Sequence, residues 1–275
     1  MPSYKLISSD LDGTLLKKNK TVSDENRKAI AELSQKGVQF ALSSGRTLGE
    51  IPDHVKGDPN VRYVIHSDGA VIYDKKTNTR MEECMTGEVN KFVLDTLFSY
   101  HSYLTVRYLG ESYADELIPT TEESLLTYRL SKDYRDFVRA NFNFSNDFKN
   151  FCYGMEQIEM ICVFFADDEE MAECRRRLSE DPALEISASE PYNLEIYSCK
   201  AGKGKALLRL AEALHISQSE TIAMGDSPND MEMVEMAGLG LAMENATDEL
   251  KAVADAVICN NEQHAVVYVK EHYFD

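Results

Sequence analysis

The sequence has no tryptophan, only seven prolines, and six cysteines in 275 residues. None of the cysteines forms a C-x-x-C pair or lies near a histidine at the spacing of zinc ligands, and the six histidines show no metal spacing either. These spacings argue against a zinc site. We expect the cysteines to be small buried thiols in a reducing compartment.

Positive charge and long apolar runs are also scarce. Lys and Arg total 29 against 47 Asp and Glu, a formal net charge of −18, whereas a protein that binds duplex nucleic acid needs a basic face. No apolar run approaches the ~18 residues of a membrane span, and the N-terminus lacks the basic and then apolar pattern of a signal peptide. We therefore expect a cytoplasmic protein with no nucleic-acid and no membrane partner.

The two ends of the chain alternate between strand and helix patterns. Near the N-terminus we predict a helix that begins after an N-cap at Ser23 and ends before Gly37. Strands are predicted on either side of it, at Tyr4–Ser9, Val38–Ser43 and Val61–His66. The last 75 residues show the same alternation, with strands at Thr221–Met224, Leu239–Met243 and Ala256–Cys259. This rhythm predicts an α/β fold with a Rossmann-like parallel sheet.

The middle of the chain has a different pattern. It carries seven of the fourteen tyrosines, helical stretches at Val89–Tyr100 and Asp168–Leu178, and a strand at Glu159–Phe165. We interpret residues 85–189 as an inserted α+β domain. Residues 1–84 and 190–275 then form the core domain around the parallel sheet.

Asp10 and Asp12 follow the first predicted strand directly, in the string Asp-Leu-Asp-Gly-Thr-Leu-Leu. Ligands bind at the carboxyl ends of strands in open α/β sheets. Gly13 lets the chain turn sharply there, and Thr14 can donate a hydroxyl. One carboxylate suits a nucleophile or a ligand for a hard cation, and the other suits an acid or base.

Two further segments follow predicted strands in the same way. Ser44-Gly45-Arg46 offers a hydroxyl, free backbone N–H groups and a planar cation. Gly225-Asp226-Ser-Pro-Asn229-Asp230 delivers another carboxylate to the same edge of the sheet.

A lysine cluster completes the set. Lys203 stands at the start of a predicted helix, where a cation opposes the helix dipole, so an anionic partner would explain it. Lys200 and Lys205 compete for that role. Asp10, Asp12 and Asp226 together would repel one another unless a divalent cation intervened, and all-oxygen ligands suit Mg²⁺. A phosphoryl group fits beside such a site.

Together these motifs resemble the haloacid dehalogenase-like (HAD) superfamily, and within it the Cof-type phosphatases with a class-two, B-type cap. The resemblance rests on the motifs around Asp10, Ser44, Lys203 and Asp226, with weaker matches at Asp68-Gly69-Ala70 and Met243-Glu-Asn245-Ala246. It implies a HAD core with an inserted cap, and a Mg²⁺-dependent phosphatase of small phosphorylated metabolites.

The resemblance also implies a role for each matching residue. Asp10 would be the nucleophile that forms a phospho-aspartate, and Asp12 the acid and base. Asp10, the backbone carbonyl of Asp12, and Asp226 would hold Mg²⁺, with Asp230 supporting the metal site. The residues implied for gripping the phosphate are Ser44, Gly45 and Lys203, with Arg46 as a supporting cation, and Asn229 would contact the phosphate or orient Lys203.

The chain departs from the family pattern at Asp68, where the family usually has asparagine, and at Gln263–Val266, where it usually has Asp-Gly-Val. Substrate preference therefore stays open among sugar phosphates, nucleotides and cofactor phosphates. A phosphomutase on the same scaffold and a non-catalytic ligand sensor are the alternatives. The sequence indicates no oligomeric state, monomer or homodimer.

Overall fold

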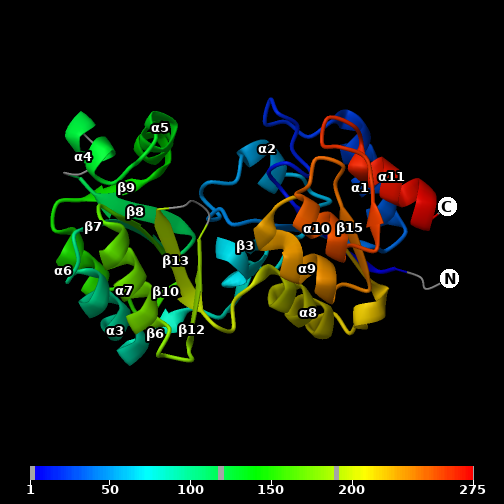
Figure 1. Cartoon of the computed structure of the whole chain (residues 1–275). Coiled ribbons are helices and arrows are strands. Elements are labelled where there is room, and N and C mark those ends of the chain that lie inside the picture. Colours follow the sequence, from blue (N-terminus) through cyan, green and yellow to red (C-terminus); the bar gives the residue numbers. More distant parts are fainter. Residues whose placement is uncertain (1–3, 117–120, 189–191, 275) are drawn as a thin grey trace. The chain divides into compact units, whose positions relative to one another are not determined.

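The computed structural model describes residues 4–116, 121–188 and 192–274. Their contacts divide the chain into two compact units (Figure 1). The first consists of Met1–Arg46, Ile51–Glu82 and Gly202–Asp275, and the second of Thr47–Glu50 and Glu83–Ala201. The predicted domain boundary between residues 189 and 190 lies outside the described residues.

The first unit is built on an eight-stranded sheet with the strand order β16-β15-β14-β1-β2-β3-β4-β5. Its strands are β1 (Leu6–Asp10), β2 (Gln39–Ser43), β3 (Tyr63–His66), β4 (Val71–Asp74), β5 (Thr79–Glu82), β14 (Thr221–Gly225), β15 (Leu239–Ala242) and β16 (Ala256–Val257). All neighbours from β16 to β3 pair in parallel, which confirms the predicted fold class. The antiparallel edge strands β4 and β5 were not predicted.

Helices and short 3₁₀ turns connect these strands. They are α1 (Asp24–Gln35), α2 (Asp53–Lys56), η1 (Ser67–Gly69), α8 (Lys203–Ala213), η3 (Gln218–Glu220), η4 (Pro228–Asp230), α9 (Met231–Met236), α10 (Asp248–Val253) and α11 (Ala265–Tyr273). The predicted N-cap of α1 is confirmed, because the side chain of Ser23 accepts a hydrogen bond from the backbone N–H of Asn26. Gly37 follows α1 with a φ of 87°, a conformation that glycine adopts readily.

Apolar side chains attach the helices to this sheet. Leu207 and Leu210 of α8 and Met233 of α9 share one buried cluster with Leu6 of β1 and Ala41 of β2. α1 and α11 lie side by side (Figure 1), and Asn26 Oδ1 of α1 accepts from the backbone N–H of Val266 at 3.0 Å. This packing fixes the strands whose carboxyl ends carry the polar motifs.

The second unit contains a six-stranded sheet with the order β12-β13-β11-β7-β8-β9 and a separate pair, β6 with β10. Its strands are β6 (Met85–Thr86), β7 (Ser102–Tyr108), β8 (Glu111–Asp115), β9 (Asn143–Ser145), β10 (Gln157–Ile158), β11 (Met160–Phe165), β12 (Leu184–Ser187) and β13 (Asn193–Ser198). Its helices are α3 (Gly87–Leu97), α4 (Glu122–Thr127), α5 (Lys132–Asn141), α6 (Phe148–Tyr153) and α7 (Asp168–Leu178). Neighbouring strands are antiparallel except β8 and β9.

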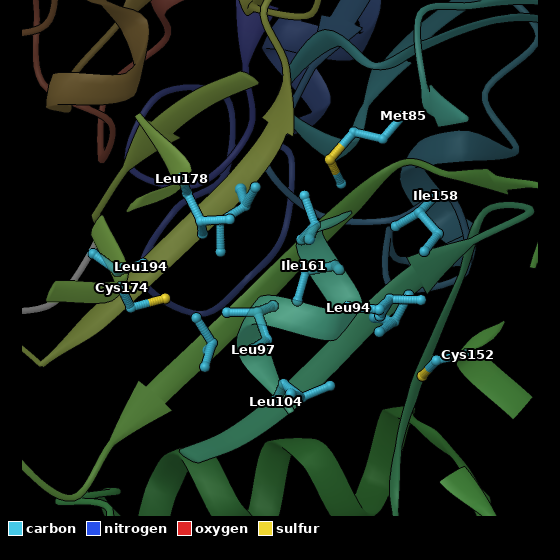
Figure 2. Close-up of a cluster of buried hydrophobic side chains, with 14 of the residues drawn as sticks. Met85, Leu94, Leu97, Leu104, Cys152, Ile158, Ile161, Cys174, Leu178 and Leu194 are labelled. Atoms are coloured by element: carbon cyan, nitrogen blue, oxygen red, sulfur yellow. The ribbon is translucent and has the colours of Figure 1, made fainter. Parts of the chain in front are cut away.

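Alternate side chains of β11 contribute to two separate hydrophobic clusters. Ile161 joins Leu94 of α3 and Leu178 of α7 in the larger one (Figure 2). Cys162 and Phe164, which are two residues apart along β11, belong to the other cluster. This alternation is what a strand with both faces covered requires.

Two expectations from composition can be compared with the described residues. No helix among them combines the length and the apolar character that crossing a bilayer would demand. All six cysteines are free thiols, and Cys152, Cys162 and Cys174 are buried. Burial raises the pKa of each of these three thiols to about 12, so they are thiols rather than reactive thiolates.

Candidate active site

Neighbouring strands bring the polar motifs together at the carboxyl edge of the first sheet. Asp10, the last residue of β1, is the ladder partner of Ser43, the last residue of β2. On the other side of β1, Ser9 pairs with Met224 of β14, one residue before Gly225-Asp226. The parallel register therefore places three motif loops next to one another.

A buried lysine links two of these motifs. Lys203 Nζ lies 2.8 Å from Asp10 Oδ1 and 2.7 Å from Asp230 Oδ1. Lys203 is 2% exposed, Asp10 4% and Asp230 0%. Burial alone would lower the pKa of Lys203, but the two carboxylates raise it, so this lysine stays charged. Burial and then Asp230 hold the pKa of Asp10 well above its usual range.

The structure distinguishes among the three competing lysines. Lys203 is the one at Asp10, whereas Lys205 forms an ion pair with Glu232 at 3.3 Å and Lys200 is exposed. Glu232 also accepts from the backbone N–H of Gly204 at 3.0 Å. Glu232 could not be identified from the sequence motifs. Its carboxylate accepts a hydrogen bond from a backbone N–H group at the start of α8, which the ammonium group of a lysine cannot do.

The third carboxylate is held by the turn after β1. Thr14 Oγ1 donates to Asp226 Oδ1 at 2.9 Å. Gly13 has a φ of 82°, and a Cβ added to it would lie 2.2 Å from Asp226 Oδ2, so only glycine fits here. Burial, followed by the repulsion of Asp230, raises the pKa of Asp226 to about 6 against the hydrogen bond from Thr14.

Among the described residues, Asp10, Asp226 and Asp230 form an acidic cluster whose ligand atoms lie within 4.8 Å of one another. Asp230 Oδ1 accepts from Lys203, while its Oδ2 accepts from the backbone N–H groups of Asp226 and Ser227, both at 3.0 Å. Asp10 Oδ2, in contrast, is buried and has no hydrogen-bond partner among the described residues. The all-oxygen donor set of the cluster fits a hard divalent cation.

Asp12 is not part of that cluster, and its side chain contacts two cations. Arg46 forms a fork with both carboxylate oxygens, Nε to Oδ2 at 2.6 Å and Nη2 to Oδ1 at 2.9 Å. Lys20 Nζ adds a bond of 2.9 Å to Oδ1. Burial would raise the pKa of Asp12, but the hydrogen bonds and charges of Arg46 and Lys20 lower it. Asp12 is therefore a carboxylate in this arrangement.

Ser44 and Gly45 lie at the same edge, beside the residue that departs from the family pattern. A Cβ on Gly45 would lie 3.1 Å from both oxygens of Asp68. Asp68 is 7% exposed, has a φ of 49° and accepts from Asn229 Nδ2 at 3.2 Å. The structure thus brings Asp68 into the site with Gly45 and Asn229.

Comparison with known proteins gives this geometry a family. A family model described as haloacid dehalogenase-like hydrolase matches residues 7–269. Phosphatase YwpJ of Bacillus subtilis is 32% identical over 98% of this chain and 99% of its own. The 5-amino-6-(5-phospho-D-ribitylamino)uracil phosphatase YwtE of the same organism is 31% identical over 96% of each chain. A solved haloacid dehalogenase-like hydrolase from B. subtilis has a TM-score of 0.78, with 31% identity over 98% of this chain and 99% of its own.

The chain therefore belongs to the haloacid dehalogenase-like hydrolase family. This confirms the family predicted from the motifs and the predicted enzyme class, because the relatives are named phosphatases. Phosphatases of this family use a divalent metal, and the acidic cluster provides a site of the right chemistry.

The buried ion triad makes a prediction about stability. We expect Lys203→Met to lower the free energy of unfolding by about 3–5 kcal/mol at pH 7, because it leaves two buried carboxylates without their cation. The matched control is Lys205→Met, which removes a half-exposed ion pair and should cost less than about 1 kcal/mol. Urea unfolding measures both, and equal losses would contradict the importance of the triad.

Asp226 makes a prediction about pH and metal. Its pKa of about 6 in the folded protein lies above the ordinary 3.8, so the folded state favours the protonated form. The stability that this preference gives to the folded state is fully present below pH 4 and is lost as the pH rises through 6. Without metal, Asp226→Asn should therefore have a higher melting temperature than the wild type at pH 7.5 and a similar one at pH 4. Added Mg²⁺ should stabilise the wild type more than the variant at pH 7.5, and equal stabilisation would rule out Asp226 as a ligand.

Proposed function

We propose that this protein is a Mg²⁺-dependent phosphatase that hydrolyses small phosphorylated metabolites through a phospho-aspartate at Asp10. The observation that carries the proposal is the asymmetry of the Asp10 carboxylate. Lys203 fixes Oδ1 at 2.8 Å, while Oδ2 is buried without a hydrogen bond among the described residues. A fixed, desolvated carboxylate oxygen is suited to attack phosphorus.

The phosphoryl group would be held by residues that surround Asp10. Ser44 offers a hydroxyl, Gly45 a backbone N–H and Asn229 an amide. Lys203 supplies a positive charge that needs no reorganisation, since it is already buried and fixed. Phosphoryl transfer depends mainly on such positioning and charge stabilisation.

Mg²⁺ would be bound by Asp10, the backbone carbonyl of Asp12, and Asp226. When bound, it offsets negative charge on the transferring group. Asp230 would act indirectly, because its two oxygens hold Lys203 and the backbone of the Asp226 loop.

Asp12 would act in both halves of the reaction, which are the transfer of the phosphoryl group to Asp10 and the hydrolysis of the phospho-aspartate. As the carboxylate seen here, it suits the second half, in which it takes a proton from the water that hydrolyses the intermediate. In the first half it would give a proton to the leaving oxygen, so it must carry one and loosen its fork with Arg46. The fork consists of two short bonds of 2.6 and 2.9 Å, so Arg46 would determine how readily Asp12 takes up a proton.

The names of the relatives and the charge of the chain support the proposed substrate class. The relative named for a phosphorylated ribitylamino-uracil supports a metabolite-sized monoester. The net charge of −18 disfavours polyanions. Residues 85–189 would act as a cap that limits the site to sugar phosphates, nucleotides or cofactor phosphates.

The test is phosphate release from a panel of small phosphomonoesters. We expect release with Mg²⁺, loss of release with a chelator, and a decrease in kcat of at least about 10³-fold in Asp10→Asn. Asp248→Asn, on the exposed start of α10, is the matched control and should keep wild-type rates. Full activity of Asp10→Asn would refute the mechanism, and an isomerised sugar phosphate in place of free phosphate would favour a mutase.

A further inference from the structure

The turn that carries Asp68 has an unusual backbone conformation. Ser67, Asp68 and Gly69 follow one another with φ values of 50°, 49° and 87°, a left-handed conformation that is uncommon for residues with a side chain. Two hydrogen bonds within the first unit hold this turn. Ser67 N–H donates to the carbonyl of Arg46 at 2.8 Å. Asp68 N–H donates to the carbonyl of Ser44 at 3.2 Å, so the turn is tied to the loop that follows β2.

The other side of this turn packs against the start of α8. A Cβ added to Gly69 would collide with the carbonyl oxygen of Gly202, so only glycine fits there. Arg209 Nη2 of α8 donates to the carbonyl of Gly69 at 2.7 Å. Contacts on both sides therefore fix the turn, and with it Asp68, between the loop after β2 and the start of α8.

The side chain of Asp68 lies beside residues that we propose to hold the phosphoryl group. It accepts from Asn229 Nδ2 at 3.2 Å, and both of its oxygens would lie 3.1 Å from a Cβ on Gly45. Burial lowers the pKa of Lys203, and Asp68 is one of the carboxylates whose charge raises it. The phosphate position is therefore within electrostatic reach of Asp68.

The charge of Asp68 is not matched by a direct cation partner. Asp68 forms no ion pair among the described residues, whereas Arg46 pairs with Asp12. The neutral amide of Asn229 is the one side-chain donor to Asp68 in the described part of the chain. Because Asp68 is only 7% exposed, water screens its charge poorly. A negative group bound beside it is repelled more strongly than it would be at an open surface.

We propose that Asp68 is a specificity-determining residue whose charge weakens the binding of anions at the phosphate position. The site therefore selects monoesters whose leaving group is neutral or cationic, and it releases inorganic phosphate readily. This inference rests on the proposed phosphatase function. Each negative charge beyond that of the phosphate adds repulsion from the same carboxylate. An asparagine, the usual residue of the family here, could accept the same hydrogen bond from Asn229 without that charge.

Three esters that differ in one terminal group test this preference. They are 2-aminoethyl phosphate, 2-hydroxyethyl phosphate and phosphoglycolate, whose terminal groups are positive, neutral and negative. With Mg²⁺ at pH 7.5, we expect the wild type to have a kcat/KM for phosphoglycolate about 10-fold below that for 2-hydroxyethyl phosphate. The value for 2-aminoethyl phosphate should be at least as high as that for the neutral ester. A wild type that prefers phosphoglycolate would contradict the proposal.

Asp68→Asn removes the charge and keeps the shape of the side chain. Asparagine also tolerates the φ of 49° at this position, so the turn should be preserved. In this variant the ratio of kcat/KM for phosphoglycolate to that for 2-hydroxyethyl phosphate should rise about 5-fold. The intrinsic reactivities of the two esters cancel when the variant is compared with the wild type. An unchanged ratio would overturn the proposal.

Binding of inorganic phosphate gives a readout that needs no turnover. In calorimetric titrations with Mg²⁺ present, Asp68→Asn should bind phosphate about 5-fold more tightly than the wild type. Titration with Mg²⁺ alone should show equal or weaker binding by the variant, because the removed charge attracts cations. Damage to the site would instead weaken the binding of both ions. Equal or weaker phosphate binding by the variant would refute the role of Asp68.

The matched control is Asp74→Asn. Asp74 pairs with Arg62 at 2.6 Å. It is the ladder partner of Tyr63 at the start of β3, so it lies at the opposite edge of the sheet from Asp68. This variant removes the same charge and an ion pair, but it should change neither the ester ratio nor the phosphate affinity. Shifts as large as those of Asp68→Asn would show that net charge or stability is responsible, against the proposal.

The phosphate titration separates this inference from the proposed function. If the wild type releases phosphate from no ester, the proposed function is refuted, and tighter phosphate binding by Asp68→Asn still supports an anion-repelling role. If the esters are hydrolysed but Asp68→Asn changes neither the ratio nor the affinity, the phosphatase function stands and the role of Asp68 is refuted.

Discussion

The candidate site depends on one buried cation between two buried carboxylates. Lys203 touches Asp10 and Asp230, and all three side chains are almost completely removed from water. Each carboxylate alone would be costly there, and the lysine makes both tolerable. The triad also joins three segments that are far apart in the sequence: the end of β1, the start of α8 and the turn before α9.

The carboxylates in and beside the triad make different contacts. Lys203 occupies one oxygen of Asp10, and the other oxygen has no hydrogen-bond partner among the described residues. The second oxygen of Asp230 accepts hydrogen bonds from the backbone N–H groups of the Asp226 loop, so Asp230 stabilises that loop. Thr14 holds Asp226 by a hydrogen bond, and burial and the repulsion of Asp230 raise its pKa to about 6, so a cation at the proposed metal site would favour its charged form.

Much of this could be predicted from the sequence because the information is local. Strand patterns that lead directly to Asp10, Ser44 or Asp226 indicate a shared sheet edge, and parallel pairing then brings those residues together. N-caps such as Ser23 are local signals as well. The hairpin of β4 and β5 was missed, because alternating strands and helices predict only parallel neighbours.

Other features of the site depend on side-chain contacts over long sequence distances. Nothing in the string Ser-Gly-Arg indicates that Arg46 would grip Asp12, or that Glu232 would relieve the start of α8. Asp68 could be identified as a departure from the family, but only the structure shows it beside Gly45 and Asn229.

The central claim is that the free oxygen of Asp10 attacks phosphorus. The most direct measurement uses Asp12→Asn, which should still react with p-nitrophenyl phosphate but hydrolyse the intermediate slowly. After rapid acid quenching and proteolysis, mass spectrometry should find one phosphoryl group on the peptide that contains Asp10. Stoichiometric nitrophenol release with no phosphoryl group on that peptide would contradict the account.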